Sequence, residues 1–530
     1  MPYYVIHAGS SLQKLATDGT ISSLSLPSGV TVSAARRTRF AILDRWMIAV
    51  NAVSRNIFMD AATLQSRLLN IAGPGAALTA AAGAAGNPNG EYRYKFTYAI
   101  MSGTDVIVES PFSPESDPIT LASLKGALSA ITVSSTTGVN ARRIYRTTNG
   151  SSTYYLLATI TDNTTTVYTD DSTDYDLALL GEVEPRANAP GVDATDRLQL
   201  IAAWKDRLWA TSLNDPDVIR FTANREIYAW PSTYALNAKP VGEDEIGVTT
   251  FVPRRNELLI GKRSRILKII GDSIDTFEVV GVTEGIGPIS NEATVVVRDV
   301  PYFLGEDGFY AYGPGGLTNL TRDRVHPWFT TDDYFNRALF DQAFAKWNPK
   351  YDVIDLHLAA AGSTSIDRWV SFDLRTQQWF GPHKTDAFTP TMAALGRDDN
   401  DLLVPIVGSS AGFVYTGNRT TRSDDATAIA FALYTKFHGA NTPDIDKYWG
   451  ELALLSDKLS TGSVTITPYF DDPDSPTAGT ALTHALTTGR ERLGRVGTGR
   501  LCQLRFTEGD AGQSVMIYGY ELPFHELGRR

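Results

Sequence analysis

Cysteine is almost absent from this chain, which has a single thiol, Cys502, among 530 residues. One thiol cannot form an intramolecular disulfide, and no group of cysteines and histidines has the spacing of a zinc site. The seven histidines contain no HxH or HxxxH pair, the spacings typical of a local metal site. The sequence therefore predicts neither a disulfide framework nor a bound metal ion or cofactor.

Positive charge is in deficit, with 48 Lys and Arg against 59 Asp and Glu and a formal net charge of −11. Contacts with phosphates need an excess of Lys and Arg, so we expect no tight grip on nucleic acid. The longest weakly apolar run, at 71–86, is rich in Gly and Ala, which favours a linker over a membrane span of roughly 20 residues. No signal peptide is visible, which favours the cytosol or a particle assembled there.

Catalytic motifs are also missing: the chain has neither GxSxG nor GxxxxGK[ST]. The nearest approach to the Asp-box of propeller sialidases is "STSIDRWVSFD" at 363–373, which lacks the Gly and the spacing, so Asp367 is interpreted as a turn residue. The acidic clusters at 397–401 and 471–474 also favour turns over calcium sites. We therefore expect no enzymatic activity.

Short apolar strands, in contrast, recur along the chain in pairs around a small or polar residue. The pivots of this phrase are Gly9, Asn51, Ser212, Gly261, Gly305, Gly362 and Gly408. Apart from one long step, they are about 40–60 residues apart, which is close to the period of a β-propeller with four strands per blade. The stretch "RWVSFDLRTQQWF" at 368–380 then reads as two strands of one blade. The alternative is a set of ordinary β-hairpins in unrelated β-sandwiches.

The long step predicts an insertion. Its strand "GEYRYKFTYAIM" alternates strictly, and Asn149–Gly150 is a strong hairpin signal. We expect an all-β protein: a propeller of six or seven blades, with an inserted fibronectin type III or immunoglobulin-like β-sandwich and a C-terminal β-rich platform. The fibronectin version is preferred because no Cys…Trp…Cys pattern is present. The expected domains are 1–75 for the first blades, 76–187 for the insertion, 188–429 for the remaining blades and 430–530 for the platform. The segment 181–191 is expected to be the exit of the insertion.

Two groups of residues are candidate functional sites. The first comprises five arginines near the C-terminus: Arg490, Arg492, Arg495, Arg500 and Arg505. They are interpreted as a subunit contact, as solvated side chains paired with acidic loops such as 471–474, or as a contact with DNA. The second is a loop with Gly313, Gly315 and Gly316, interpreted as a blade connection that could act as a channel gate. In addition, 331–347 is expected to open as a short helix capped by Thr331.

Together, these segments resemble the tail nozzle or tail hub proteins of short-tailed bacteriophages. The resemblance rests on "ELLIGKRSRILKIIGD", "VPYFLGEDGFYAYGPG" with "RDRVHPWF", the C-terminal "RERLGRVGTGRLCQLRF…MIYGYELPF", and the insertion "RRIYRTTNGSSTYYLLATITDNTTTVYTDD". It spans most of the chain. It implies a homo-hexameric ring in the virion tail, below the adaptor or head-to-tail connector ring and beside tail fibres or a tail needle. Double-stranded DNA would pass through its channel without specific binding.

Two other functions remain open at this stage. One is a receptor-binding or carbohydrate-active propeller, whose mark would be a pair of carboxylates in a cleft. The other is a distal tail or baseplate component of a long-tailed phage.

Overall fold

The chain divides into two compact units, residues 1–382 with 392–405 and residues 383–391 with 406–530, and each is described by itself. The structure is a computed structural model. It describes residues 3–180, 197–231, 233–239, 247–385, 387–397, 401–417, 423–424, 427–509 and 515–528. The expected exit segment 181–191 lies outside the described residues.

Seven small antiparallel sheets form the propeller within the described residues. In chain order, sheet 1 is β1 (Tyr3–Ala8), β2 (Ser11–Ala16) and β3 (Ile21–Ser23); sheet 2 is β4 (Arg39–Leu43), β5 (Trp46–Val50), β6 (Ile57–Asp60) and β7 (Ser66–Leu68); sheet 3 is β15 (Leu198–Trp204), β16 (Arg207–Ser212), β17 (Val218–Phe221) and β18 (Ala235–Asn237). Sheet 4 is β19 (Thr250–Pro253), β20 (Leu258–Lys262), β21 (Arg265–Ile270) and β22 (Glu278–Glu284); sheet 5 is β23 (Thr294–Val297), β24 (Val300–Leu304), β25 (Phe309–Gly313) and β26 (Gly316–Asn319).

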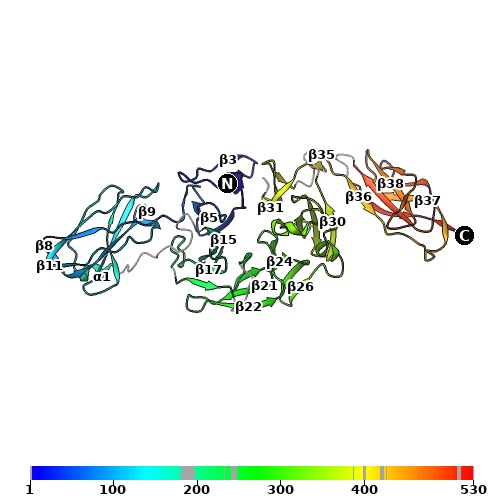
Figure 1. Ribbon diagram of the computed structural model, residues 1–530. Coiled ribbons are helices and arrows are strands. Elements are labelled where there is room, and N and C mark those ends of the chain that lie inside the picture. Colours follow the sequence, from blue (N-terminus) through cyan, green and yellow to red (C-terminus); the bar gives the residue numbers. More distant parts are fainter. Residues whose placement is uncertain are drawn as a thin grey trace. The chain divides into compact units, whose positions relative to one another are not determined.

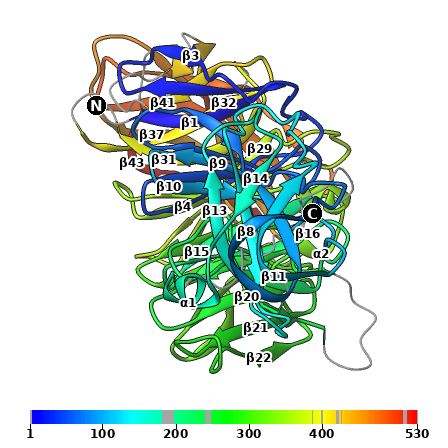
Figure 2. The ribbon, with the colours of Figure 1, turned by 90° about the vertical axis from the view of Figure 1, so that its left-hand side faces the viewer.

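Sheet 6 is β27 (Phe344–Asn348), β28 (Val353–Leu358), β29 (Arg368–Asp373) and β30 (Gln378–His383), and sheet 7 is β31 (Pro390–Arg397), β32 (Leu403–Ser409) and β33 (Val414–Thr416). Figure 1 shows sheets 2 to 6 following one another around a common centre, and the three longest strands of sheet 4 lie side by side in Figure 2. The boundary between the two units falls within sheet 7.

Each of the seven repeated phrases falls in a different sheet of the propeller. The pivots Gly9, Gly305 and Gly362 lie in the turns between two paired strands, whereas Gly261 and Gly408 lie inside strands. The stretch 368–380 supplies β29 and most of β30, as expected. The all-β propeller fold predicted from the repeat is therefore confirmed, with two of its sheets carrying three strands instead of four.

Aromatic side chains fill the core between sheets 3 and 4. The ring of Trp209 stacks on Phe221 with centroids 4.6 Å apart, and Phe277 meets Trp209 edge to face at 5.0 Å. Trp209 is fully buried, and Trp204 is 6 % exposed. Large rings bury much apolar area per residue, so a few of them stabilise the packing of one narrow four-stranded sheet on the next.

Two further sheets interrupt the series between sheets 2 and 3. One has the order β14 (Tyr168–Asp170), β11 (Ile119–Ser129) and β8 (Thr79–Tyr92), and the other has the order β10 (Asp105–Glu109), β9 (Tyr94–Ser102), β12 (Ala141–Thr147) and β13 (Tyr154–Ile160). The helix α1 (Asp174–Leu179) follows, with Thr173 and Asp176 forming a capping box. The Tyr94 hydroxyl donates to Asp170 of the other sheet at 2.8 Å, so these faces oppose each other as in a β-sandwich. Its assignment to the fibronectin type stays a prediction.

A non-strand segment, "SPFSPES" at 110–116, runs along residues 94–98 of β9, on the side where β10 pairs only with residues 99–102. The backbone N–H groups of Ser110, Ser113 and Ser116 donate to the carbonyls of Tyr98, Phe96 and Tyr94. In return, the three serine hydroxyls accept from the backbone N–H groups of the same three aromatic residues, at 2.9, 3.1 and 2.9 Å. Serines three residues apart thus match strand positions two residues apart. The backbone N–H and C=O groups of this part of β9 therefore have hydrogen-bond partners without a regular strand beside them.

The C-terminal unit contains a second two-sheet module. One sheet holds β36 (Phe431–Tyr434), β42 (Cys502–Glu508), β38 (Ser463–Phe470), β39 (Thr477–Ala478) and β40 (Leu482–Ala485). The other holds β41 (Arg490–Gly499), β37 (Asp446–Ser456), β43 (Ile517–Glu521) and β44 (Phe524–Gly528), with β43 and β44 pairing with successive parts of β37. A two-stranded hairpin of β34 (Ser423–Asp424) and β35 (Thr427–Ala428) precedes them. The core of the two-sheet module contains Trp449, Leu452, Leu504 and Phe506.

The expected helix at 331–347 is wrong in its start and its cap. The structure has α2 (Pro327–Thr330) before it and a 3-10 helix, η1 (Arg337–Gln342), inside it. The Asn336 side chain, and not Thr331, caps η1 by accepting from the Ala338 N–H at 3.2 Å. Asn is as good an N-cap as Thr, and sequence alone does not choose between two candidates five residues apart.

Candidate functional site

Three of the five C-terminal arginines share one face of the sheet formed by β41, β37 and β43. Arg490 and Arg492 lie two residues apart on β41, so they point to the same side. A bulge next to Gly494, whose φ is +128°, then shifts the register, and Arg495 pairs with Glu451 on that side too. All three arginines are exposed. We call this outward side, with Glu451 and Glu521, the arginine face.

A surface pocket of about 590 Å³ opens on the arginine face. Its floor is Ala453, which pairs in register with Arg492 on one side and Glu521 on the other. At its other end, Tyr448 pairs in register with His525 of β44. The lining is completed by Gly450, Glu451, Leu522 and Pro523. The pocket exists because the central strand carries Gly and Ala between flanking strands that carry large side chains.

The other two arginines do not join this face. Arg500 lies in the turn before β42, where its Nε is 3.3 Å from Asp446. Arg505 lies on β42, in the opposite sheet, with its guanidinium 5.2 Å from the Tyr434 ring centroid. A hydrogen bond with Tyr469 raises the pKa of Arg505. The five arginines are therefore not one strip, and a subunit contact through them stays a prediction.

The predicted gate loop is a hairpin inside sheet 5, so its description as a blade connection is wrong. Gly313 ends β25 and pairs with Gly316, which begins β26 with φ +93°. A Cβ on Gly313, Gly315 or Gly316 would meet no atom within 4 Å. The two short strands were too weakly patterned to be separated in sequence from a connecting loop. Gating by this hairpin stays a prediction.

Sequence reasoning missed a polar cluster at the centre of the propeller, which we call the axial clasp. Arg39, at the start of β4, donates through Nε to Glu292 at 2.7 Å and through Nη1 to the Gln199 carbonyl at 2.9 Å. Arg37 donates to the Gln342 carbonyl at 2.8 Å. The two arginines and their three partners lie in, or within two residues of, the first strands of sheets 2, 3, 5 and 6. Two arginine side chains from the start of the chain therefore bind groups up to 305 residues away in sequence.

The clasp is largely withdrawn from solvent. The side chains of Arg39 and Glu292 are 22 % and 7 % exposed. Burial alone would raise the pKa of Glu292, but the facing Arg39 guanidinium more than offsets this and holds that pKa below its ordinary value. Burial lowers the pKa of Arg37, whose guanidinium also lies 5.2 Å from the Phe344 ring. A buried charge pair of this kind holds its two side chains in place, because separating them would leave each charge buried without a partner, which costs free energy.

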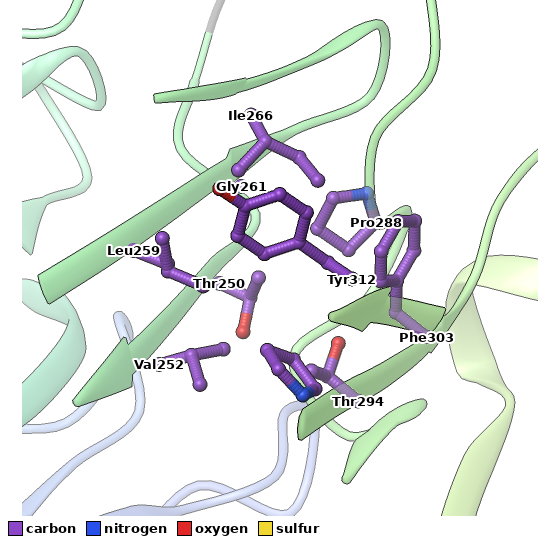
Figure 3. Close-up of a pocket in the computed structure, with 10 residues that line it drawn as sticks. Thr250, Val252, Leu259, Gly261, Ile266, Pro288, Thr294, Phe303 and Tyr312 are labelled. Atoms are coloured by element: carbon purple, nitrogen blue, oxygen red, sulfur yellow. The ribbon is translucent and has the colours of Figure 1, made fainter. Parts of the chain in front are cut away.

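A second cavity lies in the seam between sheets 4 and 5, and its apolar lining is shown in Figure 3. Its volume is about 10 Å³, roughly the least space that holds one water. Gly261 lies at this seam, and a Cβ there would come within 2.1 Å of Pro288 and 2.5 Å of Thr250. The glycine is thus required because its paired residue Thr250 and the connecting residue Pro288 pack closely against β20, and the cavity is a packing gap.

The remaining chemical candidates lie in structural positions. Asp367 accepts from the Ala360 N–H at 2.8 Å across the turn between β28 and β29, as the turn interpretation predicts. In the part of the chain that the structure describes, no group of three metal-ligating side chains occurs. The described helices include none that is long and apolar enough to cross a bilayer.

No protein-family model matches the chain, and no curated protein matches it. Among solved structures, it is similar to PorZ, a surface component of the type-IX secretion system of Porphyromonas gingivalis, at 11 % identity over 99 % of this chain and 81 % of that one, with a TM-score of 0.29. It is also similar to the dihydro-heme d1 dehydrogenase NirN at 10 % identity, covering 78 % and 73 % of the two chains, with a TM-score of 0.32. The propeller domain of Cps50 (Swd1) from Myceliophteria thermophila matches at 9 % identity over 78 % and 99 %, with a TM-score of 0.25.

Proposed function

We propose that this chain is a structural virion protein that forms the tail nozzle or hub ring of a short-tailed phage and continues the DNA channel below the adaptor. The resemblance of its blade phrases and C-terminal strands to that family motivates the proposal. In this role the propeller is a rigid wall unit, and the two additional β-modules supply contacts with neighbours.

The observation that carries the proposal is the axial clasp. The chain's own side chains bridge four sheets at the centre, with Arg39 and Glu292 in a two-pronged contact at 2.7 and 3.2 Å. Bidentate arginine–carboxylate pairs add geometric specificity as well as energy. The clasp braces the sheets against sliding past one another, which suits a subunit whose task is to hold its shape in a ring.

The charge of the chain supports the same role. Each copy has a formal net charge of −11, so six copies carry about −66. A wall of the same sign as the DNA phosphates repels them and lets a duplex slide, because tight binding requires neutralising lysines and arginines.

Electron microscopy of the intact particle, at a resolution that traces the chain, tests the proposal. We expect six copies in a ring around the tail axis, with this chain lining the channel. A peripheral position, or trimers away from the axis, overturns the proposal. A position in the baseplate of a long tail supports the distal-tail alternative instead.

Two variants test whether ring assembly depends on the axial clasp. Arg39→Met leaves the buried Glu292 without its cation, and we expect it to reduce incorporation into rings. Arg45→Met is the matched control, since Arg45 is 62 % exposed and lies 3.6 Å from Asp60. Equal ring formation by both variants would show that the clasp is not what assembly depends on.

A further inference from the structure

We propose that the pocket on the arginine face is a binding site for a neutral carbohydrate. The proposal goes beyond a structural ring role, and it gives Arg492 a ligand to bind in place of a neighbouring subunit. All of the pocket's lining lies in the C-terminal module, on β37, β41, β43, β44 and the turn between the last two.

The size and shape of the pocket come first. Its volume of about 590 Å³ is within the range of about 300–1,000 Å³ that is typical of small-molecule sites. It runs along β37 from Tyr448 to Ala453, which at about 3.3 Å per residue is roughly 16 Å. An elongated site of this length suits a short chain of linked rings better than a compact ion.

The polar groups at one end face each other without pairing. Arg492 and Glu521 flank the Ala453 floor in register from the two neighbouring strands. Two strand spacings separate their backbones by about 10 Å. Arg492 forms no ion pair with any described residue, and Glu521 is held only by Arg490, at 3.4 Å, with both side chains more than 60 % exposed. A donor and an acceptor are thus both available across an open floor.

The charge of the lining decides between ligand classes. One arginine faces two glutamates, Glu451 and Glu521, so the formal charge of the lining is −1. This disfavours an anion such as phosphate. A divalent cation would need more converging oxygen ligands, and no group of three metal-ligating side chains occurs among the described residues.

The hydroxyl groups of a carbohydrate can form hydrogen bonds with both Arg492 and Glu521. A hydroxyl both donates and accepts, so one ligand can pair with a guanidinium, which only donates, and a carboxylate, which only accepts. At the other end of the pocket, the aromatic residues Tyr448 and His525 pair in register on neighbouring strands, and Pro523 also lines the pocket. Ring faces of this kind pack well against the C–H face of a sugar while their polar tips remain hydrated.

Saturation-transfer difference NMR on the intact chain tests the site, with maltohexaose, cellohexaose and chitohexaose as probes and a polygalacturonate oligomer as the anionic comparison. We expect transfer to at least one neutral sugar. Arg492→Ala and Glu521→Gln should each weaken binding about tenfold, since each removes one charged hydrogen-bonding group. Ala453→Leu fills the floor without removing a polar group and should abolish binding.

Arg500→Ala is the control for surface charge, because Arg500 lies outside the pocket, and we expect its affinity to stay within twofold of the parent. Thermal unfolding of each variant shows that it is folded. Absence of transfer to all three neutral sugars overturns the proposal, as does binding of the anionic oligomer alone or unchanged binding by Ala453→Leu. Loss of sugar binding leaves the proposed ring unaffected, and a chain found outside the tail ring leaves this site unaffected, so the two proposals fail separately.

Discussion

Two strands of this protein carry three arginines each, and they place them in opposite environments. On β12, "ARRIYRT" holds Arg142, Arg143 and Arg146, which are 0, 5 and 0 % exposed. On β41, "RERLGRVGTG" holds Arg490, Arg492 and Arg495, all of which are exposed. The arginine content is equal, so composition does not explain the difference.

Topology and partners explain it. β12 lies inside its sheet, with the other sheet of the sandwich against one face, whereas β41 is the last strand in its sheet's order. Each arginine of β12 also has a carboxylate: Arg142 meets Asp162 at 2.9 Å, Arg143 meets Glu109 at 2.6 Å and Arg146 meets Asp170 at 2.7 Å. Charged side chains are buried only when they are paired. An arginine-rich strand can therefore lie in the interior where other segments place carboxylates beside its arginines.

The largest expected effect is at Arg146. Its side chain and that of Asp170 are both fully buried, and it also donates to Asp174 at 2.9 Å. Arg146→Met leaves Asp170 buried without its cation, which should lower the free energy of unfolding of the sandwich by about 3–5 kcal/mol. Chemical denaturation of the full chain, followed by a probe in the sandwich, measures this.

The double variant Arg146→Met/Asp170→Asn is the control for that prediction. It removes both charges, so we expect it to recover part of the lost stability. A single variant as stable as the parent would mean that pairing is not what keeps arginine inside β12.

A smaller effect is expected from the serine segment on β9. Ser113→Ala removes the hydroxyl that accepts from the buried Phe96 N–H at 3.1 Å, leaving that donor without its partner. The expected loss in unfolding free energy is about 1–3 kcal/mol. The control is Ser475→Ala, an exposed serine of the C-terminal module, which should change stability little. Equal effects at both serines would contradict a structural role for the segment.

The pH dependence of stability tests the pairing of Arg142 with its partner Asp162. Backbone N–H groups of Thr165 and Thr164 hold the pKa of Asp162 well below its ordinary value of 3.8. Because the folded-state pKa is the lower one, its contribution to stability is complete above the ordinary value and is lost as the pH falls below it. We therefore expect Asp162→Asn to be less stable than the parent at pH 7, with the gap narrowing below pH 4. The free energy of unfolding of both proteins is measured from pH 7 down to about pH 3. A difference between them that stays constant over this range would contradict the prediction.

The smallest effect is expected on β41. Arg495→Ala removes an exposed side chain whose guanidinium is 5.9 Å from the Tyr448 ring centroid, and stability should change by no more than about 0.5 kcal/mol. Thermal unfolding of the C-terminal module measures it. A loss comparable with that of Arg146→Met would show that β41 is covered in solution after all.

The repeated propeller phrases were readable from sequence because each is local: its two strands are neighbours in the chain and pair across a short connection. The pairing of Arg39 with Glu292 was not readable, because its two halves are 253 residues apart and neither half has a local pattern. The arginines of 490–505 were visible as a group, but a bulge and a sheet boundary decide which of them face the same way. Only three do, and the pocket beside Arg492 depends on a small residue, Ala453, that carries no signal by itself.

The axial clasp also imposes an order on the protein's synthesis. Arg39 emerges from the ribosome 253 residues before Glu292, and the complete sandwich at 79–170 is made between them. At about 5–20 residues per second, Arg39 is made roughly 13–50 s before its partner Glu292. The interposed module can fold during that interval, while the early sheets still lack their neighbours. The order of synthesis therefore makes the whole sandwich available before the Arg39–Glu292 pair can form.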